Sequence, residues 1–97
     1  MSSLKEYLLT CLTEELLEAG QESCKCIRFT TDHVDPVSKQ QNVRKLEIEL
    51  AQVVAVTQML EEHCGLKIEI QPADIEEKKQ RMLKYMRIST TMGTLNK

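Results

Sequence analysis

Residues 3–29 read SLKEYLLTCLTEELLEAGQESCKCIRF. At about 100° of rotation per residue, this stretch gathers apolar side chains into one sector, which predicts a single amphipathic helix. The apolar stripe is made by Leu4, Leu8, Cys11 and Phe29. Three glutamates, Glu15, Glu18 and Glu22, project into the same sector, where a helix would normally carry leucine.

Carboxylates on the core-facing side of a helix need compensation. An ionised side chain removed from water costs free energy, and several carboxylates close together also repel one another. A hard divalent cation, which takes oxygen ligands, is the usual compensator for such a group. The three glutamates therefore predict a metal ion held inside a helical bundle.

Length and composition predict a single all-α domain over residues 1–97. Aromatic residues make up only 3% of the chain, whereas Leu, Met, Glu, Lys and Gln, which favour helices, are abundant. A chain of 97 residues buries a modest core. We therefore expect an antiparallel helical bundle that is completed by oligomerisation.

The charge and hydropathy patterns argue against two classes of partner. The net charge of −2, without a basic stripe interleaved with aromatic residues, disfavours nucleic acid. The longest uninterrupted apolar run, Val53 to Val56, is too short to span a bilayer, and no signal peptide is evident. We expect no membrane partner and a cytoplasmic location.

The four cysteines raise two alternatives to a carboxylate site. Disulfides are not expected without a secretory signal. A zinc site would draw on Cys24, Cys26, His63 and Cys64. The C-x-C spacing, however, places its two thiols about 200° apart on one helix and matches no zinc knuckle or ribbon. We therefore interpret all four, Cys11 included, as reduced thiols that are buried or half-exposed.

Local signals set the limits of the first helix. Ser3 and Glu6 form a capping box at its start, which satisfies the first free backbone amides. Residues 30–41 are polar, contain Pro36 and lack periodicity, so they predict a loop. A loop of this length often covers a functional site.

Two further helices are expected after this loop. The second covers about residues 42–64, is apolar on nearly all sides, and is stopped by Gly65. Residues 66–70 alternate like a strand but have no partner strand, so we interpret them as an extended connection. A capping box in residues 74–77 opens the third helix, which runs to about Ser89. We expect the first two helices to be antiparallel and the third to pack across them.

The spacing of oxygen-bearing side chains on the first two helices suits a metal. Glu15 and Glu18 are three residues apart, which puts their carboxylates on one face about 4.5 Å apart along the axis. Glu49 and Gln52 repeat the spacing on the second helix. Two antiparallel helices presenting these pairs to each other would form a four-oxygen cage for Mg²⁺, which commonly adds waters and substrate phosphates.

The motifs resemble a known family. Residues 14–18, EELLE, followed by residues 49–52, ELAQ, resemble the EExxE…ExxD signature of the all-α MazG-like nucleoside triphosphate pyrophosphohydrolases. The order and spacing of further segments are similar to the small phage and bacterial members over nearly the whole chain. These segments are residues 25–29 (KCIRF), Asn42, residues 75–79 and residues 85–95.

The resemblance implies a hydrolase that cleaves a (deoxy)nucleoside triphosphate between its α- and β-phosphates, giving the monophosphate and pyrophosphate. It implies a Mg²⁺ cofactor, with Mn²⁺ as a substitute, and assembly as a homodimer or homotetramer. By position, Glu15, Glu18 and Glu49 would be the catalytic metal ligands. A water at the metal would attack the α-phosphorus. The implied cellular role is the house-cleaning of nucleotide pools.

The resemblance also implies residues that contact substrate. Lys25 and Arg28 would meet phosphates, and Asn42 would help to hold the base or sugar. Gln52 stands where the family has the aspartate of ExxD, so it would be a metal ligand without a negative charge. Glu22, one turn beyond Glu18, suggests the hypothesis that it partly replaces the lost carboxylate as a ligand.

Other interpretations stay open at this point. Because of Gln52, the chain could be a MazG-like nucleotide-binding or oligomerisation module without turnover. It could also be a plain helical oligomerisation protein whose glutamates form salt bridges. Lys25 and Arg28 could be ordinary surface cations, and Asn42 could serve as the N-cap of the second helix.

Overall fold

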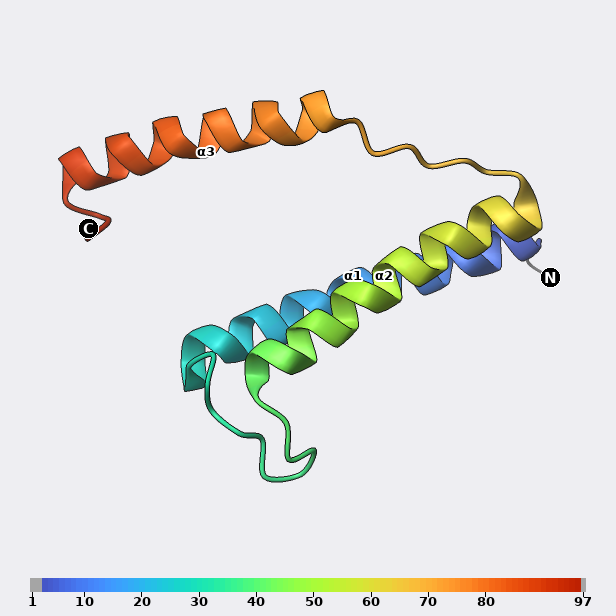
Figure 1. The fold of residues 1–97 in the computed structure, drawn as a ribbon, viewed down its shortest axis with the longest axis horizontal. Helices are drawn as coiled ribbons and strands as arrows, with labels where there is room; N and C mark the ends of the chain where they lie inside the picture. Colours follow the sequence, from blue (N-terminus) through green and yellow to red (C-terminus); the bar gives the residue numbers. More distant parts are fainter. Residues whose placement is uncertain (1–2, 97) are drawn as a thin grey trace.

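The computed structural model describes residues 3–96 as three α-helices, and among these residues there is no strand. The helices are α1 (Leu4–Phe29), α2 (Asn42–Cys64) and α3 (Pro72–Met92). Figure 1 shows α1 and α2 lying side by side as an antiparallel hairpin, with α3 at a distance from both. The predicted all-α class is therefore confirmed. None of these helices is long and apolar enough to cross a bilayer.

An apolar seam joins α1 to α2. Leu8 and Ala19 on α1 and Leu60 on α2 are its buried apolar side chains, and Leu60 has no exposed surface. Polar side chains occupy the middle of the same seam in three facing pairs. The pairs are Glu15 with Gln52, Glu18 with Glu49, and Glu22 with Lys45. In each pair the two residue numbers have the same sum, as expected where two antiparallel helices keep one register. The antiparallel register therefore sets Glu18 opposite Glu49, whereas Glu15 faces an amide and Glu22 faces a lysine.

The N-terminal caps agree with the sequence analysis in one case and differ in another. The backbone amide of Glu6 donates to Oγ of Ser3 at 3.1 Å, as a Ser3 cap requires. The N-cap position of α2 is occupied by Gln41, without a side-chain cap, so the interpretation of Asn42 as the N-cap is wrong. Asn42 is instead the first helical residue, and its side chain is free to bond elsewhere.

The connection between α1 and α2 is an ordered turn. An isolated antiparallel bridge pairs Val34 with Gln41. Within it, Oδ1 of Asp35 accepts hydrogen bonds from the backbone amides of Val37 at 2.8 Å and Ser38 at 3.3 Å. An aspartate that bonds the backbone two residues ahead is a common way to fix a turn. The predicted loop is thus held by its own hydrogen bonds.

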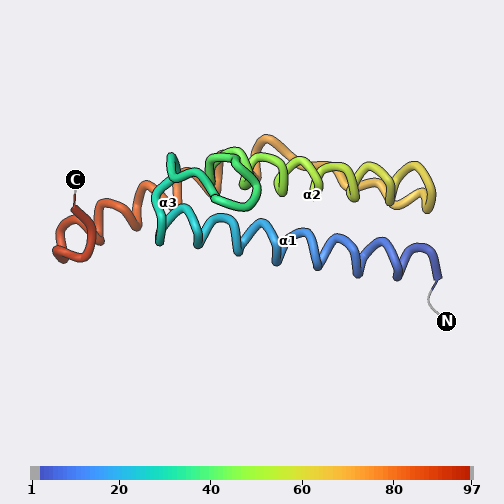
Figure 2. Tube along the Cα trace, turned by 90° about the horizontal axis from the view of Figure 1, so that it is seen from below, coloured from blue at the N-terminus to red at the C-terminus, as the bar shows by residue number. Residues whose placement is uncertain are grey.

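The third helix differs from its predicted limits and packing. It begins at Pro72, which suits the first turn because proline has no amide to leave unpaired, so the expected start at Asp74 is two residues late. It continues to Met92 and stops at Gly93. Within residues 3–96, α3 contacts neither α1 nor α2, so the expected packing across the hairpin is wrong for the single chain. Figure 2 gives the view turned by 90°.

We predict that the end of α2 depends on the left-handed backbone at Gly65. Gly65 has φ of 68° and its amide donates to the carbonyl oxygen of Glu61. Substitution Gly65→Ala should lower the free energy of unfolding by about 1 kcal/mol, because a Cβ disfavours this conformation. Urea unfolding followed by circular dichroism, at a fixed protein concentration, measures the change.

The matched control is Gly65→Asn, since asparagine tolerates left-handed backbone better than alanine does. The added Cβ meets no atom within 4 Å, so both substitutions test the backbone rather than packing. Equal losses for Ala and Asn, or no loss for Ala, would contradict the prediction.

Candidate metal centre

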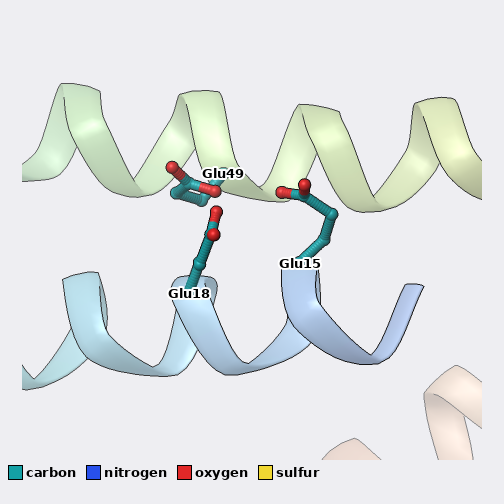
Figure 3. Close-up of side chains that lie close together, drawn as sticks. All are labelled: Glu15, Glu18 and Glu49. Carbon is teal, nitrogen blue, oxygen red and sulfur yellow. The ribbon is translucent and has the colours of Figure 1, made fainter. Parts of the chain in front are cut away.

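Three carboxylates meet at the middle of the α1–α2 seam. Each of Glu15, Glu18 and Glu49 offers an oxygen, and these oxygens all lie within 4.8 Å of one another. Glu15 and Glu49 are half-buried, whereas Glu18 is exposed. Figure 3 shows Glu18 and Glu49 facing each other across the two helices and Glu15 reaching toward α2 from the neighbouring turn. The antiparallel register brings together the three residues that the sequence analysis expected to share a site.

The electrostatics of this cluster are unfavourable in the absence of a cation. Desolvation raises the pKa of Glu49, and the negative charges of Glu18 and Glu15 raise it further. Among the described residues, no lysine, arginine or histidine forms a salt bridge with any of the three carboxylates. The helical salt bridges that would have offered an ordinary explanation for them are therefore not found there.

Gln52 lies beside the cluster on α2. It faces Glu15, in the pair next to Glu18 and Glu49. In the amide orientation that satisfies its hydrogen bonds, its nitrogen donates to Oε2 of Glu15 at 2.8 Å and to Oε2 of Glu49 at 3.0 Å. This places two amide hydrogens against two carboxylates, which offsets part of their repulsion. Rotation of the same amide by 180° would instead present its oxygen, a neutral ligand for a hard cation.

Glu22 lies apart from the three carboxylates, with lysines. The side chain is buried, with 8% of the residue exposed. Its Oε1 accepts from Nζ of Lys25 at 3.3 Å, and its Oε2, which has no hydrogen-bond donor, is 3.7 Å from Nζ of Lys45. Nζ of Lys45 donates to Oδ2 of Asp35 at 2.7 Å, a bond that raises the pKa of Lys45 and lowers that of Asp35. Glu22 therefore balances lysines here instead of supplementing the acidic cluster.

The residues expected to contact substrate lie near the C-terminal end of α1. Two of them line the same hollow and the third does not. Lys25 and Asn42 line a hollow of about 290 Å³, together with Phe29, His33, Asp35 and Pro36. Asn42 is 2% exposed, and its Nδ2 donates to the carbonyl oxygen of Thr30 at 3.0 Å. Arg28 is exposed and lies over the ring of Phe29, outside this hollow. Lys25 and Asn42 thus share a site that Arg28 does not line.

The backbone is strained at Thr30, the residue whose carbonyl oxygen accepts the hydrogen bond from Asn42. Thr30 ends α1 with φ of 72° and ψ of 160°, a conformation that a β-branched residue rarely adopts. The hydrogen bond from Asn42 holds the carbonyl of Thr30 in this position. Such strain is found where surrounding contacts fix the chain, often beside functional sites. Asn42 therefore fastens the loop to the hairpin.

Sequence reasoning missed the residues that the loop and α2 contribute around Glu22. Lys45 lies on the inner face of α2, four residues before Glu49, and this spacing could have placed it one turn from the acidic cluster. Asp35 and His33 carry no helical periodicity, so no comparable signal was present for them. The four cysteines are free thiols, and Cys11, Cys26 and Cys64 are half-exposed as expected, whereas Cys24 is exposed, so the expectation is wrong for Cys24.

The comparisons with known proteins add no identification. No family model, no curated protein and no solved structure matches this chain.

We predict that Glu49 destabilises the metal-free protein and is needed for its response to Mg²⁺. Because the pKa of Glu49 is raised in the folded state, its charged form opposes folding at neutral pH, and this penalty is relieved as the pH falls below that pKa. In EDTA at pH 7, Glu49→Gln should raise the melting temperature by about 3 °C or more. Wild type should gain about 2.7 kcal/mol when free Mg²⁺ is 100 times its dissociation constant, and the variant should not.

The control is Glu47→Gln, which removes an exposed carboxylate that pairs with Arg44 on the outer side of α2. This variant should keep the full response to Mg²⁺. In wild type the response should weaken as the pH falls through the raised pKa of Glu49, since protons compete with the metal. An equal gain from Mg²⁺ in wild type and Glu49→Gln, measured by differential scanning fluorimetry, would refute the role of Glu49.

Proposed function

We propose that this protein is a Mg²⁺-dependent nucleoside triphosphate pyrophosphohydrolase of the MazG-like type. The observation that supports the proposal most is the convergence of Glu15, Glu18 and Glu49 from two helices, without a salt-bridge partner among the described residues. These are the three residues that the resemblance implies as catalytic metal ligands. The reaction forms a bond from water oxygen to the α-phosphorus and breaks the bond from that phosphorus to the bridging oxygen, releasing pyrophosphate.

The donor set fits a hard cation. Three carboxylates with oxygens within 4.8 Å of one another, and an amide that can turn its oxygen toward them, are the ligand types that Mg²⁺ accepts. When bound, Mg²⁺ polarises phosphoryl oxygens and makes water more acidic. The protein's own part is to fix the carboxylates by the helix register and to pair the nearby Lys45 with Glu22 and Asp35.

The charge distribution along the seam favours a single strongly held ion. Gln52 already donates hydrogen bonds on one side of Glu18 and Glu49, and the Glu22–Lys45 pair is balanced on the other side. Between them, the carboxylates of Glu18 and Glu49 have no salt-bridge partner among the described residues. With Gln52 in place of an aspartate, a second metal ion would have one fewer anionic ligand, so we propose one resident Mg²⁺.

The hollow beside Lys25 suits the nucleoside end of the substrate. Lys25 lies seven residues beyond Glu18 on the same helix, about 10 Å along its axis. A nucleotide with its phosphates at the glutamates would reach Lys25, whose ammonium could leave Glu22 for a phosphate oxygen. Glu22 would keep its neighbour Lys45, 3.7 Å away. Phe29 and His33 supply rings for stacking, and Asn42 holds the loop that carries His33.

Assembly and setting are part of the same proposal. The exposed apolar side chains of the hairpin and of α3 favour a homodimer or homotetramer. The proposal places this assembly in the cytoplasm, where it would control nucleotide pools.

We predict that a panel of deoxynucleoside and nucleoside triphosphates with Mg²⁺ yields monophosphate and pyrophosphate. Glu18→Gln should lower kcat/KM about 100-fold or more, because it removes a charged ligand from the centre of the cluster. Glu14→Gln, which changes an exposed neighbour, should leave kcat/KM within about twofold. Ion-exchange chromatography of the products measures both effects.

Orthophosphate as the only inorganic product, or equal turnover by wild type and Glu18→Gln, would contradict the assignment. A second candidate, a nucleotide-binding module without turnover, is favoured by the amide hydrogens that Gln52 directs at two carboxylates. Gln52→Asp separates the two, since restoring the carboxylate should raise a weak activity of the hydrolase. Stabilisation by Mg²⁺ without turnover in either version would favour the binding module.

A further inference from the structure

The third helix has apolar side chains and nothing to cover them within its own chain. Among residues 3–96, α3 has no buried residue and touches neither α1 nor α2. Four of its exposed apolar residues share one side of the helix at helical spacing. These are Ile75, Met82, Leu83 and Met86. A soluble helix with such a side is normally packed against another element.

The single chain exposes far more surface than a compact protein of its mass. Its accessible surface is 7837 Å², whereas a folded monomer of 11.2 kDa would expose about 5700 Å². Its radius of gyration is 17.2 Å, against about 12.5 Å for a compact domain of this length. The surplus of roughly 2100 Å² exceeds the about 800 Å² that each partner buries in a standard interface. The chain therefore has enough surface for a stable dimer.

The α1–α2 hairpin and the α3 helix carry net charges of opposite sign. The α1 and α2 helices together carry nine acidic and five basic side chains, a net charge of −4. The α3 helix carries three acidic and five basic side chains, a net charge of +2. A basic helix and an acidic hairpin attract each other, which favours α3 packing on a hairpin over α3 pairing with another α3.

The connection to α3 directs the helix away from its own hairpin. After the turn at Gly65, residues 66–71 form no helix or strand. Six extended residues span about 20 Å. Figure 1 shows this arm leaving the end of α2 and carrying α3 clear of both other helices. An element presented on an extended arm is the arrangement from which identical chains exchange parts.

We propose that α3 of one copy packs on the α1–α2 hairpin of a second copy, and that the second copy returns the contact. The receiving hairpin offers apolar side chains outside its own seam, with Leu9 and Leu16 on α1 and Leu50 and Val54 on α2, all exposed in the single chain. A reciprocal exchange is closed by a two-fold axis and leaves no α3 uncovered. The inference stands on α3 and does not depend on the metal centre or on the proposed activity.

The test begins with the mass in solution. Sedimentation equilibrium of the full chain should give a dimer of about twice 11.2 kDa. The double substitution Met82→Glu with Met86→Glu should weaken the dimer about 30-fold or more, because it places charge in the centre of the contact. Ile88→Glu, equally exposed but on another side of α3, should leave the dimer intact. Helix content by circular dichroism should be unchanged in both.

A mixed sample of ¹³C-labelled and unlabelled chains then locates the contact. Isotope-filtered NOEs should join the methyl groups of Met82 and Met86 in one copy to those of Leu16 and Leu50 in the other. A monomer at all concentrations, intermolecular NOEs between α3 helices only, or equal weakening by Ile88→Glu would each overturn the proposal. A wild-type protein that forms the dimer but hydrolyses no nucleoside triphosphate would count against the proposed activity alone.

Discussion

Three carboxylates that repel one another lie in the middle of the α1–α2 seam, and the polar pairs beside them belong to the same seam. The antiparallel register sets the oxygens of Glu15, Glu18 and Glu49 within 4.8 Å of one another. Desolvation of the half-buried Glu49 raises its pKa, and the negative charges of Glu18 and Glu15 raise it further, so the cluster opposes the packing of the two helices. A protein that served only to associate would gain stability by replacing them with apolar residues. Their presence therefore favours a role in binding a cation.

The polar pairs on either side explain how the hairpin tolerates the cluster. Gln52 donates to two of the carboxylates, and Lys45 stands near Glu22 while it anchors Asp35 of the loop. Apolar contacts around Leu60 close the remainder of the seam toward the end of α2. Within the seam, Glu18 and Glu49 in the middle have no salt-bridge partner among the described residues, and the loop is tied to α2 by Lys45 and Asn42.

Sequence patterns predicted the helices well because the signals for them are local. The helical periodicity of residues 3–29, the cap at Ser3 and the stop at Gly65 each depend on neighbours in the chain. The surroundings of Glu22 could not be predicted from local patterns. It shares a sector with Glu15 and Glu18, but its surroundings depend on which residue of α2 lies opposite, and the register places Lys45 there. The isolation of α3 could not be predicted either, since an apolar stripe does not reveal which chain will cover it.

The most direct test of the metal centre is anomalous diffraction from crystals grown with Mn²⁺ as a substitute for Mg²⁺. We expect one strong peak, bonded to carboxylate oxygens of Glu15, Glu18 and Glu49, with Gln52 turned to present its oxygen or a water. A peak bonded to Glu22 instead, or well-occupied Mn²⁺ elsewhere with none between these three glutamates, would contradict it.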